Sequence, residues 1–491
     1  MPHRLRPSVL ATAAASLQPS LMPHGPADRG WVATAAAATA SLAGVVGGVA
    51  LRRLSAGRLG GLAAALAGTA VGLLPPPADP IPHRSVVGRG IAWSLAAAGV
   101  DLAVFGPAAP GKARPLLRAL AAGGVLAGAV GTLRTAATKA ERDERTVEPG
   151  YGTPPDDPWV SGGPNSAVAF GDLGREGRRF VSERCTADDL AAVTGHAVEP
   201  VRVFVGFDSA PNPDDRVALA LDDLERLGGF DRSLLVVASP AGSGYVNPVA
   251  VDAVEYLTGG DVATVAIGYG LRPSILSLDR IRPGARQFAR LLEAIAGRPR
   301  RPRVVVYGES LGAFTSQDAF LGDGIDGLLR RGVDRALWVG TPYRSAFRHE
   351  VAADPRAGAY PSGSALLDQT DDEVVAHFLD HPEDPVTRFD LSLLTHRPSW
   401  LGPPTTRPPR IPDRLRWFPG ATFWATAADT VRAADVVPGR FTAWGHDYRA
   451  DLLPAVAGAY RLPTDHLDEI AAVLPARERA RAARIGVGSS G

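Results

Sequence analysis

The chain has few of the residues that build several common kinds of site. Its 491 residues include one cysteine, Cys185, which excludes an intrachain disulfide and a cysteine metal cluster. Lys and Arg total 52 against 51 Asp and Glu, so the net charge of +1 gives no overall field that attracts nucleic acid. The sequence has no HExxH motif, no Walker loop and no GxGxxG after a strand. We therefore expect no metal, no cofactor and no nucleic-acid partner.

Acidic residues are scarce in the first 133 residues, where Asp28, Asp79 and Asp101 are the only ones. Runs of Ala, Gly, Leu and Val fill this part, and Gly30 to Leu51 contains no charge. A helix rises about 1.5 Å per residue, so this run is long enough to cross a hydrocarbon core of about 30 Å. Further candidate spans are Leu59 to Leu74 and Gly90 to Gly111, with Pro7 to Met22 and Leu116 to Leu133 as marginal ones.

These runs predict an all-α transmembrane domain over residues 1–137, with four to five spans and a multi-pass location in the cell membrane. The alternative is a set of buried soluble helices preceded by a secretory signal in the first 22 residues, because alanine contributes little transfer energy. Arginines after the Gly30–Leu51 run and basic residues after the last run favour opposite orientations, so the sequence does not predict which side the remaining chain faces.

Residues 138–164 are rich first in charge and then in Pro and Gly, which is typical of a linker. Beyond it, short apolar runs alternate with amphipathic stretches, a pattern that predicts a doubly wound parallel α/β sheet over residues 165–480 and a tail over 481–491. The predicted strands are Val201–Gly206, Ser233–Ser239, Val262–Gly268, Arg303–Gly308 and Ala336–Gly340. The predicted helices are Asp214–Leu227, Asn247–Leu257, Gly284–Ala296 and Ala313–Arg330. Chemistry in such a sheet belongs at the carboxyl ends of its strands.

One of these strand ends carries Gly308-Glu309-Ser310-Leu311-Gly312, a G-x-S-x-G pattern. It follows the strand VVVY and precedes the helix AFTSQDAF, a setting in which a sharp turn lifts a serine hydroxyl above the sheet. The two glycines fit because neighbours of a tight turn have no room for side chains. Ser310 is therefore the candidate nucleophile, and an ordinary strand-to-helix turn is the alternative.

A serine nucleophile needs a histidine base and an acid, which in this arrangement come later in the chain, acid first. His446 is the candidate base because it lies in a short loop, Trp444 to Tyr448, before an amphipathic stretch. We expect its competitors His396 and His466 to be exposed to solvent. Asp384 is the candidate acid, because it follows the late strand candidate VVAHFL. Asp390 and Asp429 remain alternatives.

The oxyanion of an acyl-transfer reaction needs backbone N–H donors. One donor is expected from Leu311, directly after the serine. The loop SPAGSGYVNP after the predicted strand 233–239 is the expected source of the second, from Gly242 or Ser243. The loop that carries Asp208 and Ser209 is the less favoured provider.

The sequence resembles a bacterial family of membrane-anchored α/β-hydrolases, which joins an N-terminal multi-span membrane domain to a C-terminal hydrolase domain. The stretches that carry the resemblance are SLQPSLMP near the N-terminus, GREGRRFV at 174–181, VRVFVGFDSAP at 201–211, GSGYVNP and AVEYL within 242–257, GESLGAF at 308–314 and GHDY at 445–448. A family motif similar to Q-H-A-S-D-P aligns with residues 380–385, and this alignment supports Asp384 as the acid. The resemblance implies an α/β-hydrolase fold and a hydrolase activity, but it supplies no substrate.

Together these features predict a membrane-anchored serine hydrolase that cleaves an ester or lipid ester through an acyl-enzyme, with acyl transfer as a close variant. The expected partners are a lipid or acyl-ester substrate and membrane lipids. The alternative is a membrane scaffold or transporter accessory whose hydrolase-like domain binds a ligand without turnover. Neither the acyl chain nor the oligomeric state is predicted.

Overall fold

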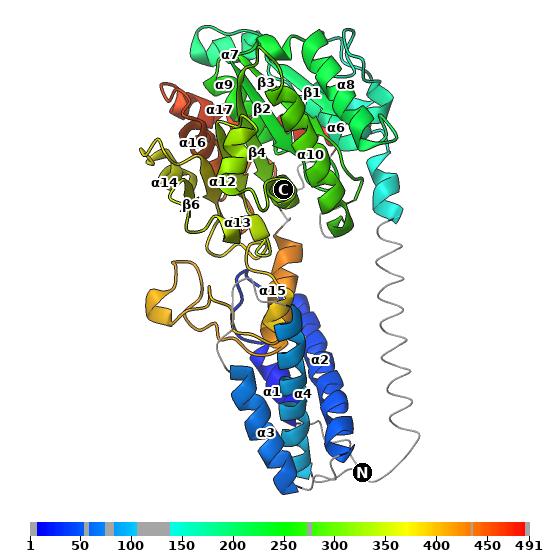
Figure 1. Cartoon of the computed structure of the whole chain (residues 1–491), viewed down its shortest axis with the longest axis vertical. Helices are drawn as coiled ribbons and strands as arrows, with labels where there is room; N and C mark the ends of the chain where they lie inside the picture. Colours follow the sequence, from blue (N-terminus) through cyan, green and yellow to red (C-terminus); the bar gives the residue numbers. More distant parts are fainter. Residues whose placement is uncertain are drawn as a thin grey trace. The chain divides into compact units, whose positions relative to one another are not determined.

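The computed structural model describes residues 7–53, 58–73, 83–105, 138–272, 277–433 and 436–486. The chain divides into two compact units, and both are discontinuous in sequence. The first unit combines residues 1–132 with residues 382–434, and the second combines residues 133–381 with residues 435–491 (Figure 1). The candidate span Leu116–Leu133 lies outside the described residues.

The second unit is built on a seven-stranded sheet in which every neighbouring pair of strands is parallel. Its strands are β1 (Val201–Val205), β2 (Leu234–Ser239), β3 (Val262–Ile267), β4 (Arg303–Glu309), β5 (Arg335–Val339), β6 (Ala357–Tyr360) and β7 (Ala376–Leu379), in the order β1-β3-β2-β4-β5-β7-β6. The five predicted strands are confirmed, and the late candidate VVAHFL contains β7. The apolar pattern did not predict β6, a short edge strand with no fully buried residue.

Helices cover both faces of this sheet, as Figure 1 shows. On one face, α8 (Pro213–Arg226) packs on β1, β3 and α10 (Ile281–Ala296), and α10 packs on α11 (Leu311–Asp318). On the other face, α9 (Pro248–Leu257) packs on β3, α16 (Arg449–Tyr460) and α17 (Leu467–Ile485). The same unit also contains α6 (Gly174–Ser182), α7 (Ala187–Thr194), α12 (Gly324–Arg330), α13 (Ala346–Glu350) and α14 (Gly363–Leu367). Strands β1, β2 and β3 are buried along their whole length, which explains why they read as continuous apolar runs.

Local signals set the helix boundaries. Asn212 caps α8 and Asn247 caps α9, in each case by accepting a hydrogen bond from a backbone N–H of the first turn, and a proline follows each cap. The prediction of one helix over Ala313–Arg330 was wrong, because the chain turns between α11 and α12. Gly322 has a φ angle of 86° in this turn, and Gly324, where α12 begins, has a φ angle of 57°; the interior of an α-helix does not allow such angles.

The first unit contains α1 (Pro7–Ala15), α2 (Pro26–Arg53), α3 (Arg58–Leu73), α4 (His83–Phe105) and α15 (Ala421–Arg432). The SLQPSLMP segment forms hydrogen bonds that join the two sequence ranges of the first unit. The Gln18 side chain exchanges two hydrogen bonds with the backbone of Arg416, at 2.6 and 2.9 Å. The Asp429 carboxylate accepts hydrogen bonds from the Ser20 hydroxyl and the Leu21 N–H and contacts His24 Nε2 at 2.6 Å. Residues 382–434 therefore fold with the N-terminal helices.

None of the helices in the described ranges combines the length and the apolarity that crossing a bilayer requires. The transmembrane domain predicted over residues 1–137 is thus not supported by α1 to α4. The predicted runs that fall within the described residues do form helices, but alanine and glycine dominate them, and these residues contribute little transfer free energy.

Candidate active site

Ser310 lies in the turn that joins β4 to α11. Its backbone angles are φ 55° and ψ −122°, a combination that is unfavourable for a residue with a Cβ atom. The Ser310 N–H donates to the carbonyl oxygen of Val339 at the end of β5, at 2.9 Å, and Phe314 N–H donates back to the Ser310 carbonyl at 3.1 Å. The sheet on one side and the helix on the other therefore hold the strained residue. Its side chain is half-buried at the carboxyl edge of the sheet.

The two glycines that flank Ser310 have no room for a side chain. A Cβ atom on Gly308 would lie 2.9 Å from Cα of Ala313, and one on Gly312 would lie 2.2 Å from the carbonyl oxygen of Ser239. Gly308 thus lets the first turn of α11 approach β4, and Gly312 lets α11 approach the end of β2. These two close approaches explain why the sequence has glycine at positions 308 and 312.

His446 lies in the loop between α15 and α16, beside the end of β5. A Cβ atom on Gly340 would lie 2.6 Å from Cε1 and 3.0 Å from Nδ1 of His446, so the imidazole packs directly on the Gly340 backbone. Gly340 follows Val339, whose carbonyl binds the Ser310 N–H. The structure thus places Ser310 and His446 at the carboxyl ends of two adjacent strands, β4 and β5, and both side chains are half-buried.

Glu309 links the candidate nucleophile to its surroundings. Its carboxylate accepts hydrogen bonds from the Tyr307 hydroxyl at 2.7 Å and from Asn247 Nδ2 at 3.3 Å. Burial raises the pKa of Glu309, whereas the Tyr307 hydrogen bond and a positive charge on His446 lower it. No sequence signal marked this residue, because a variable position of G-x-S-x-G carries no information of its own.

The two candidate oxyanion loops differ in their distance from the nucleophile along the sheet. Gly242 and Ser243 follow β2, which pairs directly with β4, and Asn247 ties the end of their loop to Glu309. Asp208 and Ser209 follow β1, which two strands separate from β4. Asp208 forms an ion pair with Arg145 at 2.7 Å. The sheet order therefore favours Gly242 and Ser243, together with Leu311 at the first position of α11.

The sequence matches two protein-family models. A family model described as the alpha/beta-hydrolase family matches residues 201–470. A second model, described as the N-terminus of that family, matches residues 86–184. The chain belongs to the α/β-hydrolase family. Comparisons with curated proteins and with solved structures gave no match.

In this α/β-hydrolase the candidate acids belong to the first unit. Asp384 is fully buried, and one of its carboxylate oxygens accepts a hydrogen bond from the Val386 N–H at 2.8 Å. Its action on His446 stays a prediction. Of the alternatives, Asp390 accepts a hydrogen bond from the Ser392 N–H, and Asp429 binds the SLQPSLMP segment.

The expectation that His396 is exposed was wrong. His396 is fully buried, and its ring nitrogens contact the hydroxyl groups of Ser85 at 2.9 Å and Thr395 at 2.8 Å. The proline-rich sequence around it suggested a surface loop, but this loop packs on α4. His466 lies half-buried directly before α17.

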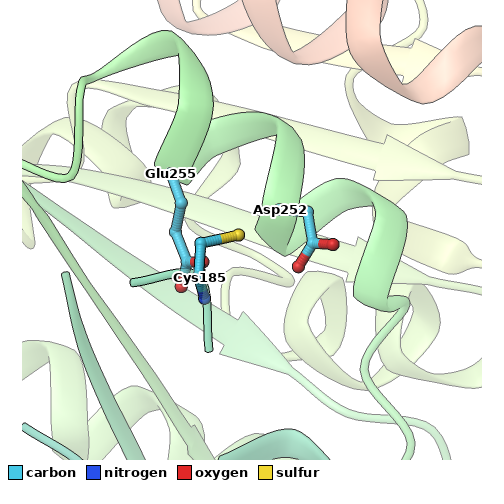
Figure 2. A group of neighbouring side chains, drawn as sticks. All are labelled: Cys185, Asp252 and Glu255. Carbon is cyan, nitrogen blue, oxygen red and sulfur yellow. Dashed lines mark hydrogen bonds between the residues drawn. The ribbon is translucent and has the colours of Figure 1, made fainter. Parts of the chain in front are cut away.

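A buried cluster in the hydrolase unit has the composition of a metal site. Figure 2 shows Cys185 beside Asp252 and Glu255 of α9, and their potential ligand atoms all lie within 4.8 Å of one another. Arg202 of β1 already binds both carboxylates, with distances of 2.6 to 2.9 Å. Arg477 and Arg481 of α17 bind Asp252 as well. Three guanidinium groups beside two carboxylates disfavour a divalent cation.

The pKa shifts of Cys185 and Asp252 also argue for an ion-pair network rather than a metal site. Burial raises the pKa of the Cys185 thiol well above its ordinary value, and the two carboxylates raise it further, so the thiolate that metals bind is disfavoured. Burial alone would raise the pKa of Asp252, but Arg481, Arg477 and Arg202 hold it below its ordinary value. The cluster is a buried ion-pair network that connects β1, α9 and α17.

We predict that Gly312→Ala destabilises the protein by about 1 to 3 kcal/mol, because the new methyl group overlaps the Ser239 carbonyl oxygen. Urea denaturation monitored by circular dichroism measures this change. Gly171→Ala is the matched control, because a Cβ atom at Gly171 would have no neighbour within 4 Å. Equal stability of the two variants would contradict the steric role of Gly312.

We also predict that Asp252→Asn lowers the free energy of unfolding by about 3 to 5 kcal/mol, since it removes the buried charge that Arg202, Arg477 and Arg481 share. Because the folded state lowers the pKa of Asp252, its contribution is present above the unfolded pKa of about 4 and disappears as the pH falls further.

Denaturation curves between pH 3 and pH 7 test both statements. Asp222→Asn is the control, since its ion pair with Arg226 is about half exposed and should contribute less than about 1 kcal/mol. A similar loss in both variants would show that the buried network does not stabilise the fold.

Proposed function

We propose that the chain is a serine hydrolase that cleaves a carboxylic ester through an acyl-enzyme. The observation that carries this proposal is the positive φ angle of Ser310 in a strand-to-helix turn, with His446 packed at the end of the adjacent strand. Such a turn raises a hydroxyl group above the sheet edge, where a substrate carbonyl can approach it. Membership of the α/β-hydrolase family supports the same reaction class.

In the proposed reaction the Ser310 hydroxyl attacks the ester carbonyl while His446 accepts its proton. The resulting oxyanion is stabilised by the N–H groups of Leu311 and of Gly242 or Ser243. His446 then protonates the leaving alcohol, and the acyl group remains on Ser310. Asp384 is the proposed acid that orients the imidazole. Water releases the acyl group in hydrolysis, and a second alcohol accepts it in the acyl-transfer variant.

We further propose that the substrate is a lipid ester and that the N-terminal helices contact lipid. Of the 22 large hydrophobic side chains that are exposed in the described ranges, eleven lie before residue 106, among them Leu62, Leu66 and Val71 on α3. Exposed apolar side chains in such a concentration are typical of surfaces that contact lipid or another protein. A catalytic unit attached to such helices would meet its substrate at the membrane.

Labelling with a fluorophosphonate probe tests the hydrolase proposal. The full-length protein should be labelled, and Ser310→Ala should abolish the labelling. His446→Gln should slow it at least about 1000-fold, because the serine loses its base. Ser364→Ala is the control, since this exposed serine on α14 should leave labelling intact. A folded wild-type protein that is not labelled would favour the scaffold alternative, in which the hydrolase-like unit binds a ligand without turnover.

Flotation with phospholipid vesicles tests the lipid contact. Replacing Leu62, Leu66 and Val71 together by glutamine should shift the protein from the floating fraction to the soluble one, because the apolar contact area is lost. The matched control replaces three exposed leucines of the hydrolase unit, Leu278, Leu321 and Leu329, and should still float. Flotation of both variants would contradict lipid contact through α3.

A further inference from the structure

His381 is a buried histidine just after β7, and both of its ring nitrogens have a polar partner. Nδ1 lies 2.8 Å from the carbonyl oxygen of Gly445, and Nε2 lies 2.9 Å from a carboxylate oxygen of Asp451 in α16. The ring stacks on Tyr448, with centroids 4.1 Å apart and planes at 20°. Its backbone N–H donates to the Tyr448 hydroxyl oxygen at 3.0 Å. The side chain is 1% exposed, so water does not compete for these contacts.

The partners of His381 determine its protonation. A backbone carbonyl only accepts hydrogen bonds, and an ionised carboxylate also only accepts them. With Asp451 ionised, both ring nitrogens act as donors, and His381 pairs with Asp451 as an imidazolium. The second oxygen of Asp451 accepts a hydrogen bond from the Gly363 N–H at 2.7 Å.

The other charged groups around His381 have partners of their own. Asp380, directly after β7, pairs with Arg348 of α13 at 2.5 Å. From the loop before α16, Asp447 pairs with Arg449 at 2.8 Å. Tyr448 contributes a ring face, which favours a cation stacked on it. The surroundings are thus compatible with a protonated ring.

The carbonyl that His381 holds belongs to a strained loop. Ala443 and Gly445 have φ angles of 46° and 60°, and a left-handed residue with a side chain, such as Ala443, costs about 1 to 2 kcal/mol. Backbone of this kind persists only where its surroundings hold it. Asp447 is fixed on one side of His446 through Arg449 and Thr442. On the other side of His446, the Gly445 carbonyl is held by its contact with His381 Nδ1.

We propose that His381 is a positioning residue for the reaction: its imidazolium, held by Asp451, fixes the Gly445 carbonyl and thereby the direction in which the adjacent His446 faces Ser310. The inference rests on the proposed function, in which His446 is the base. His381 acts through the loop and takes no proton from the substrate. Chain order gave no sign of this role, because His381 precedes the candidate acid.

Two amide variants separate the two contacts of the ring. An asparagine amide occupies the place of Nδ1, so His381→Asn can still donate to Gly445. A glutamine amide reaches the place of Nε2, so His381→Gln can bind Asp451 but leaves the Gly445 carbonyl without its donor. The rate constant of fluorophosphonate labelling should fall about 10- to 100-fold in the glutamine variant and less than about 3-fold in the asparagine variant. Thermal melting checks that both variants are folded.

The pH profile supplies a readout that a merely structural role would not change. In the wild type the labelling rate should rise as His446 loses its proton and fall at higher pH, when His381 loses the Nδ1 proton that it donates to the Gly445 carbonyl while Asp451 keeps the proton on Nε2. Asp451→Asn should move the descending limb to lower pH, because the carboxylate that stabilises the imidazolium is gone. His381→Asn should remove that limb.

The outcomes distinguish the inference from the function on which it rests. A folded wild-type protein that is not labelled overturns the proposed function. A labelled wild type with equal rates in both amide variants, or with an unchanged descending limb in Asp451→Asn and His381→Asn, overturns the role of His381 alone.

Discussion

The conformation of Ser310 is the constraint on which the candidate site depends. A serine with a positive φ angle is unfavourable by itself, and it persists because β5 binds its N–H and α11 begins at its carbonyl. Both contacts require that β4 and β5 pair in the observed register and that α11 packs against the end of β2. The stability of the sheet therefore determines the geometry of the turn, and Gly308 and Gly312 allow the close approach on which that geometry depends.

Buried charge connects the elements that carry this sheet. Arg202 on β1 binds carboxylates of α9, and α17 supplies two further arginines to the same cluster. A cluster of this kind gives less stability than its number of contacts suggests, because every charge has lost its water. Its geometric demands are strict, however, since each carboxylate has to meet particular donors. We infer that the cluster specifies how α9 and α17 pack on the sheet.

The loop that carries His446 also depends on contacts with side chains from other parts of the chain. Two left-handed residues precede His446, and bonds from distant parts of the chain hold the strained backbone in place. His381 and Asp451 are 70 residues apart in sequence but meet at 2.9 Å. In this family member the loop that carries the candidate base thus contacts side chains from other parts of the chain.

The chain's local patterns were sufficient to predict strands β1 to β5, the parallel sheet and the turn that carries Ser310. Apolar runs, caps and glycines act over a few residues, so they can be read without knowledge of the fold. Local patterns failed where distant segments decide the outcome. They placed buried His396 at the surface, gave one helix where α11 and α12 form two, and gave no sign that residues 382–434 join the N-terminal unit. Only the tertiary structure decided the contacts of His381, the ion-pair network and the packing of His446, because each depends on side chains that folding brings together across long stretches of chain.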